Sequence, residues 1–117
     1  MKTPQRHQIV YRQRTRRVRA VINGTAIRPR LSVLIGTRSN QAQLIDDVTG
    51  TTLASATDFD FTGKRGTVAS ATYVGQKIAE AAAAKKISTA VLDRRGRRYH
   101  GRVAAIAESA REHGLAI

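Results

Sequence analysis

Cysteine is absent from this 117-residue chain, acidic residues are few, and no long apolar run is present. The count of 0 Cys excludes disulfide bonds and Cys-based zinc sites. Because no stretch of about 18 apolar residues occurs, we expect no membrane-spanning helix. The amino terminus is basic but lacks the continuous apolar segment and small-residue cleavage site of a secretory signal.

The residues that are present indicate one folded domain with a polyanionic partner. A length of 117 residues is the usual size of a single domain and excludes two. Hydrophobic residues make up 41% of the chain, close to the globular norm, so we expect a packed core. The formal net charge of +13 favours nucleic acid as the partner over a membrane surface.

The positive charge is concentrated in the leading segment. Residues 1–38 hold 10 basic residues and no acidic one, whereas residues 39–117 hold 11 basic against 8 acidic residues, a net charge of +3. Arginine outnumbers lysine nine to one in that segment, and its planar fork binds phosphate and stacks on bases. A solvated tail or a signal of subcellular address is the alternative interpretation. We predict an RNA-binding arm over residues 1–25, with these candidate contacts: Arg6, Arg12, Arg14, Arg16, Arg17 and Arg19.

The arm is predicted to be partly helical. Residues 6–22 contain neither Gly nor Pro, but like charges recur at helical spacing and repel one another. We therefore expect the free arm to fray and its helix to be completed only against RNA or DNA.

Residues 26–117 predict an α/β domain with a mixed sheet. Apolar runs predict strands over residues 31–35, 43–46 and 52–57, and their short connections make them antiparallel neighbours. Apolar residues at spacings of three and four predict helices over 67–86 and 103–110. The first of these helices is the crossover that makes a fourth strand, 89–93, parallel to a neighbour. Residues 115–117 are a candidate edge strand.

Carboxylates near strand ends raise the possibility of a two-metal nuclease, at Asp46, Asp47, Asp58 and Asp93. Asp46 and Asp47 are sequence neighbours that point to opposite faces of a strand, so turn formation and pairing with Arg are favoured for all four. The three histidines are too scattered for a metal site, and Gly63-Lys64 lacks the other residues of a phosphate loop. We therefore expect no enzyme, no metal, no cofactor and no small-molecule substrate.

The loop over residues 94–102 is a better candidate site. It leaves a strand and enters a helix amino terminus, where free N–H groups favour an anion. Tyr99 and His100 are suited to stacking on unpaired bases, as in recognition of irregular RNA. The alternative is that Tyr99 packs in the core beneath the sheet. The candidate contacts of this loop are Arg94, Arg95, Arg97, Arg98, Tyr99, His100 and Arg102.

Blocks along nearly the whole chain resemble the L-eighteen family of bacterial large-subunit ribosomal proteins. The most specific are Arg-Pro-Arg-Leu-Ser-Val at 28–33 and Tyr-His-Gly-Arg at 99–102. Others lie at 23–26, 42–47, 52–56, 93–94, 110–112 and 114–115.

The resemblance implies a structural protein of the large subunit, located on the ribosome in the cytoplasm. Members of that family bind 5S rRNA and, with neighbouring ribosomal proteins, help attach it to 23S rRNA in the central protuberance. The implied fold is a three-layer, ribonuclease-H-like α/β architecture without its catalytic acids. The family's RNA contacts carry over to the arm, to Arg28 and Arg30 at the first strand, and to four residues of the late loop, Arg94, Tyr99, His100 and Arg102. Arg38 is added as a basic residue of the leading segment.

Two departures from the family pattern bear on the site. Ile35-Gly36-Thr37 and Gln41 stand where the family usually has Arg-Ser-Asn and a later aromatic. Arg95 and Arg97 stand where a small residue and an aromatic are typical, which would exchange one stacking contact for phosphate contacts. Two other function classes remain open: an RNA-processing nuclease on the same architecture, and a general nucleic-acid binder of the nucleoid type.

Overall fold

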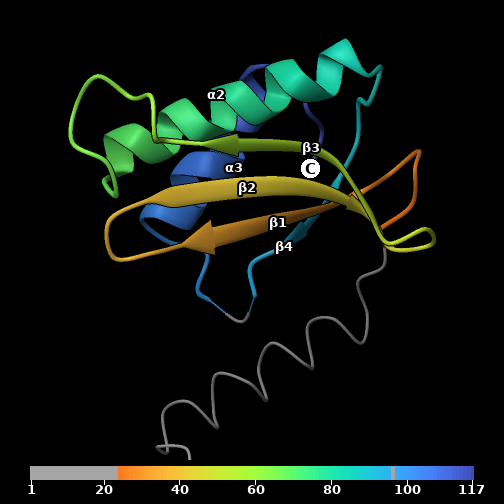
Figure 1. The fold of residues 1–117 in the computed structure, drawn as a ribbon, viewed down its shortest axis with the longest axis horizontal. Helices are drawn as coiled ribbons and strands as arrows, with labels where there is room; N and C mark the ends of the chain where they lie inside the picture. The colour runs from red at the N-terminus through yellow and green to blue at the C-terminus, as the bar shows by residue number, and fades with distance from the viewer. Residues whose placement is uncertain (1–23, 96) are drawn as a thin grey trace, which may run out of the picture.

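The computed structural model describes residues 24–95 and 97–117 as one mixed α/β sheet structure (Figure 1). The elements follow in the order β1 (Arg30–Ile35), β2 (Asn40–Asp46), β3 (Thr51–Thr57), α2 (Val68–Ala84), β4 (Val91–Asp93) and α3 (Arg102–Glu112). The α/β class and the mixed sheet predicted from the sequence are confirmed. The helix predicted over residues 6–22 lies outside the described residues.

The four strands have the spatial order β3-β2-β1-β4. β1 is antiparallel to β2, and β2 is antiparallel to β3, as their short connections predicted. β4 runs parallel to β1, also as predicted, and pairs with it only from Arg30 to Ser32. The second half of β1, from Val33 to Ile35, therefore has no strand on its β4 side among the described residues.

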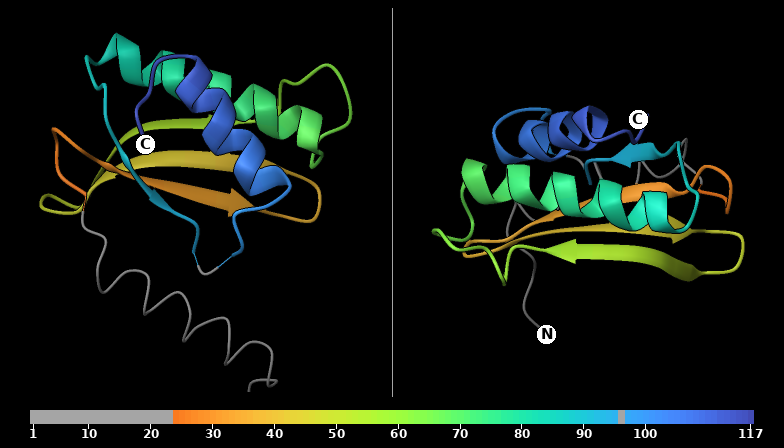
Figure 2. Two further views of the ribbon diagram at one scale, coloured as in Figure 1. Left: turned by 180° about the vertical axis from the view of Figure 1, so that it is seen from behind. Right: turned by 90° about the horizontal axis from the view of Figure 1, so that it is seen from above.

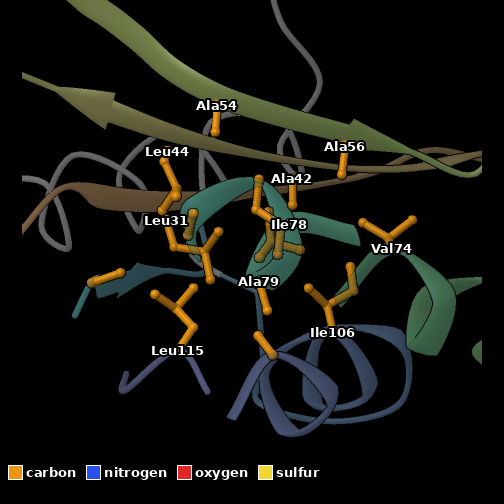
Figure 3. Packing of buried hydrophobic residues seen from close by; sticks show 14 of the residues in the cluster. Leu31, Ala42, Leu44, Ala54, Ala56, Val74, Ile78, Ala79, Ile106 and Leu115 are labelled. Carbon is orange, nitrogen blue, oxygen red and sulfur yellow. The ribbon is translucent and has the colours of Figure 1, made fainter. Parts of the chain in front are cut away.

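One face of the sheet carries the hydrophobic core. Alternate residues of the strands are buried on this face: Leu31, Val33, Ala42, Leu44, Ala54 and Ala56. They belong to the same cluster as Ile78 of α2 and Ile106 of α3, and the side chains converge between sheet and helices (Figure 3). Both helices consequently cover the same face (Figure 2), so the described elements form two layers instead of the three that the family resemblance implied. The other face of the sheet has no helix among the described elements.

The two helices cross closely at Gly75. A Cβ atom at this position would lie 2.4 Å from the Ile106 carbonyl oxygen and 2.7 Å from Ser109 Cβ. Ser109 Oγ also donates a 2.6 Å hydrogen bond to the Thr72 carbonyl. Alanine and glycine at the crossing thus allow α3 to pack directly against the backbone of α2.

The amino terminus of α2 and the start of β2 are joined by polar side chains. Thr67 caps the helix, and its hydroxyl accepts from Ser70 N while Ser70 Oγ accepts from Thr67 N. The fully buried Asn40 side chain donates to both Ser70 Oγ and the Thr67 carbonyl. These bonds explain why β2 begins three residues before the predicted 43, since its polar first residue finds partners inside the domain.

The carboxyl-terminal segment closes the core beside β4. Leu115 is 1% exposed and belongs to the hydrophobic cluster. Gly114 has φ of +101°, a left-handed conformation that suits glycine immediately after the end of α3. Thr89 and Ala116 form an isolated parallel bridge, so the candidate edge strand over 115–117 makes a single pairing.

Candidate nucleic-acid interface

The basic loop between β4 and α3 runs beside the second half of β1, where β4 has already ended. Figure 1 shows this loop projecting away from the helical layer, next to β4. Arg97 Nη2 donates to the Ile35 carbonyl at 3.3 Å, which holds the loop against β1. Arg97 N also donates to the Arg94 carbonyl at 3.1 Å. The end of β1 thus anchors the loop through Arg97.

Asp93 fixes the base of this loop. It is 0% exposed, and its Oδ1 accepts the backbone N–H of Arg95 at 2.9 Å. That bond supports Arg95 at φ of +56°, a left-handed conformation that side chains disfavour. The other oxygen, Oδ2, accepts from Arg30 Nη1 at 2.8 Å. Asp93 therefore joins the first residue of β1 to the start of the loop.

Arg30 and Asp47 extend the same network to the point where the arm enters the domain. Arg30 Nε and Nη2 donate to the Asp47 carboxylate at 3.0 Å each, a two-pronged ion pair. Asp47 Oδ2 also accepts Gly24 N at 2.7 Å. The hydrogen bond to Asp47 is the main reason that the pKa of Arg30 is raised, and Asp93 adds to it in spite of burial.

Arg30 is consequently an internal residue. Its side chain is only 10% exposed, whereas Arg28, two positions earlier, is exposed. The sequence could not separate them, because both are arginines flanking Pro29. Strand pairing places Arg30 opposite Val91, where two carboxylates surround it. The geometry supports a positioning role for Arg30, and a direct contact with RNA stays a prediction.

The aspartates considered for a nuclease serve turns and arginine pairs, as the favoured interpretation predicted. Asp46 accepts from Val48 N and from the Thr49 hydroxyl in the turn after β2. Asp58 Oδ2 accepts from Gly66 N at 2.9 Å. Asp47 and Asp93 converge on a guanidinium instead of a shared metal. In the part of the chain that the structure describes, no group of three His, Cys, Asp or Glu residues could hold a metal ion.

Arg102 ties three segments together beneath the loop. Its Nη1 lies 2.7 Å from the Gly36 carbonyl, 3.1 Å from the Gly66 carbonyl and 3.2 Å from Asn40 Oδ1. It therefore links the start of α3 to the β1–β2 hairpin and to the segment before α2. The half-buried Arg102 has a structural role in the fold, and its contact with RNA stays a prediction.

Tyr99 lies at the surface. Its 38% exposure shows that the alternative of a core position beneath the sheet is wrong. Arg111 of α3 donates from Nη1 to the Tyr99 hydroxyl at 2.7 Å, and its guanidinium lies 5.7 Å from the ring centroid. His100 beside it is exposed. Arg111 adds a cation to this surface that the sequence interpretation did not include, because it lies nine residues beyond the loop.

The structure brings some of the predicted contacts together and separates others. Arg38 at the hairpin tip is exposed, and the backbone of Arg38 packs against Gly66. The exposed Lys64 and Arg65 precede Gly66, and they too were missed, because the phosphate-loop pattern there failed. Arg28 lies at the opposite end of β1 from these residues. The described cations toward the hairpin end come from three segments, the hairpin tip, the segment before α2 and the loop after β4, and are Arg38, Lys64, Arg65, Arg94, Arg95, Arg97 and Arg98.

The arm contacts predicted at residues 6–19 lie outside the described residues. Among the described helices, none is long and apolar enough to cross a membrane. With the four aspartates considered above used in turns and ion pairs, and with cations exposed toward one end of the sheet, the described residues define a basic α/β domain.

Comparison with known proteins identifies the family to which this domain belongs. A family model described as "Ribosomal L18 of archaea, bacteria, mitoch. and chloroplast" matches residues 5–117. Proteins named large ribosomal subunit protein uL18 are similar to the chain over most of its length. The one from Lactobacillus acidophilus is 54% identical over 104 residues, which are 88% of each chain. That from Streptococcus suis is 52% identical over 91% of this chain and 88% of its own. That from Lysinibacillus sphaericus is 48% identical over 98% of both.

The chain belongs to the ribosomal protein L18 family. It is a structural ribosomal protein and not an enzyme, so the nuclease alternative is set aside. Ribosomal RNA and other ribosomal proteins are its partners, and the bacterial ribosome places it in the cytoplasm, as predicted.

Proposed function

We propose that the protein binds 5S rRNA and helps attach it to 23S rRNA in the central protuberance of the large subunit. The observation that carries this proposal is the basic surface at the hairpin end of the sheet, on a member of a ribosomal protein family. Its cations come from three separate segments, the hairpin, the segment before α2 and the loop after β4. A folded RNA is the ligand whose phosphates can meet cations in such a fixed arrangement.

The proposed mechanism has two parts and no turnover. The arm over residues 1–25 neutralises phosphates, and the folded domain selects the shape of the RNA. Arg97 and Arg98 are exposed on a loop whose base Asp93 fixes, and the Arg97 guanidinium is held against the Ile35 carbonyl before RNA arrives. Preorganisation of this kind reduces the ordering that binding requires. Tyr99 and His100 add surfaces for stacking on unpaired bases.

A salt titration of 5S rRNA binding tests the proposed contacts. If about 8 phosphates are neutralised, log K falls against log salt with a slope of roughly −6 to −7. Replacing Arg98 by Ala is expected to make the slope shallower by about 1, since one phosphate contact is lost. Lys85 is exposed at the carboxyl end of α2 and is not a predicted contact, so Lys85→Ala is the comparison that separates this surface from general charge. A binding constant insensitive to salt would contradict the proposal, and equal affinity for duplex DNA would favour the general nucleic-acid binder.

A further inference from the structure

Gly24, the first residue of the described domain, is anchored by Asp47. Its N–H donates to Asp47 Oδ2 at 2.7 Å, and its carbonyl accepts the Asp47 N–H at 3.0 Å. Gly24 is buried, whereas the four residues that follow it, 25–28, are exposed. The hold on Gly24 is therefore a separate anchor, placed before the chain reaches the buried Pro29 and enters β1.

Close packing makes glycine the residue that fits this anchor. A Cβ atom on residue 24 would collide with Arg30 N and with the Ile45 carbonyl oxygen, and it would lie 2.8 Å from Arg30 Cβ. Arg30 and Ile45 are paired in the register of β1 and β2, so their backbone atoms cannot move aside without disturbing the sheet. The backbone of Gly24 thus lies directly against the paired ends of these two strands.

The Asp47 carboxylate also connects the anchor to the loop after β4. Asp47 accepts from Arg30 Nε and Nη2 at 3.0 Å each, and Arg30 Nη1 donates to Asp93 at 2.8 Å. Asp93 in turn accepts the Arg95 N–H at the base of the loop. The arm is joined covalently to Gly24, so the point at which it leaves the domain is fixed relative to that loop.

We propose that Gly24 is a positioning residue for RNA binding, which holds the origin of the arm so that arm and loop reach one RNA over a short tether. This inference rests on the proposed function, because it concerns how two RNA-binding parts act on one ligand. The last predicted arm contact, Arg19, is five positions from Gly24 and ten from Pro29, the next buried residue. The effective concentration of a tethered element falls at least as about the −3/2 power of tether length, so doubling the tether weakens binding about threefold or more.

Insertion of a flexible segment tests the anchor without removing any described contact. Gly-Ser-Gly-Ser-Gly placed between Asn23 and Gly24 doubles the tether from Arg19 to the anchor. The matched control carries the same insertion between Lys2 and Thr3, ahead of every predicted contact. We expect the first variant to bind 5S rRNA about threefold or more weakly than the control at each salt concentration. Its salt slope and melting temperature are expected to equal those of the unmodified protein, because all phosphate contacts and the fold are kept.

Gly24→Ala supplies the second readout. The added Cβ is expected to release residue 24, so the Asp47 N–H, whose acceptor is the Gly24 carbonyl, exchanges its hydrogen faster. Binding of 5S rRNA is expected to weaken as in the first insertion variant, and circular dichroism checks that the fold is retained.

The outcomes separate the role of Gly24 from the proposed function. Equal affinities for the two insertion variants would overturn the positioning role alone, and so would a Gly24→Ala variant with faster exchange and unchanged affinity. Failure of the unmodified protein to bind 5S rRNA would overturn the proposed function and the positioning role together.

Discussion

Arg30 and Asp93 form a buried ion pair, with 2.8 Å between Nη1 and Oδ2, across 63 positions of sequence. The pair joins the first residue of β1 to the last residue of β4. Arg30 also binds Asp47, which accepts Gly24 N, and Asp93 accepts Arg95 N. The Arg30 guanidinium therefore connects the start of the described domain, at Gly24, with the base of the loop after β4.

Replacing Arg30 is expected to destabilise the fold strongly. Arg30→Leu removes the 2.8 Å ion pair with the fully buried Asp93, and breaking a buried pair costs about 3–5 kcal/mol of unfolding free energy. Arg28→Leu, two residues away and exposed, is expected to change stability by less than about 0.5 kcal/mol. Urea unfolding followed by circular dichroism measures both. Equal midpoints for the two variants would contradict the role of Arg30 in positioning the loop.

The lowered pKa of Asp58 predicts that the fold loses stability in acid. Burial alone would raise its pKa, but hydrogen bonds from Gly66 N–H, Asn40 N–H and the Ser70 hydroxyl lower it below 3.8, its ordinary value. A lowered pKa stabilises the fold above about pH 4, and that contribution is lost as pH falls through the folded pKa. Unfolding free energies between pH 6 and pH 2 test this. Asp58→Asn is expected to flatten the curve there, while the exposed Asp60→Asn leaves its shape unchanged; the reverse pattern would contradict the assignment.

Removal of the Arg102 side chain is expected to loosen the hairpin between β1 and β2 locally. Arg102→Ala leaves the Gly36 and Gly66 carbonyls without this donor, so the hairpin and the segment before α2 separate more readily. We expect faster hydrogen exchange at Gly36 N–H, which bonds to the Ser39 carbonyl, and at Gly66 N–H, which bonds to Asp58. Exchange in α2 serves as the internal reference. Unchanged exchange at both glycines would mean that Arg102 does not hold these segments.

Deletion of residues 1–22 separates the arm from the domain. The described core is built from residue 31 onward, so we expect circular dichroism and melting of the shortened protein to be mostly retained. RNA binding is expected to weaken strongly and its salt slope to become shallower, because six predicted phosphate contacts are removed. Collapse of the fold on deletion would show instead that the arm is part of the core.

Much of the fold was predictable because its signals are local. Apolar periodicity marked α2 and α3, and short connections fixed the antiparallel order of β1, β2 and β3. The start of β2 was not predictable, because Asn40 is stabilised by Ser70 and Thr67, which lie far along the chain. From the sequence alone, a polar residue such as Asn40 is assigned to a loop, because its hydrogen-bond partners lie far along the chain.

The candidate site was predictable in its location but not in its division of roles. The cluster of arginines marked the loop after β4, yet sequence cannot tell a buried arginine from an exposed one. Arg30 and Arg28 differ only in which carboxylates the sheet brings to them.

Competition between 5S rRNA and tRNA for the full-length protein, at about 150 mM salt, tests the central claim most directly. Both RNAs are compact and highly charged, and salt at this level screens exposed charges beyond about 8 Å, so simple charge attraction favours neither. The account predicts that 5S rRNA displaces tRNA completely and that excess tRNA does not displace 5S rRNA. Equal competition by the two RNAs would contradict it.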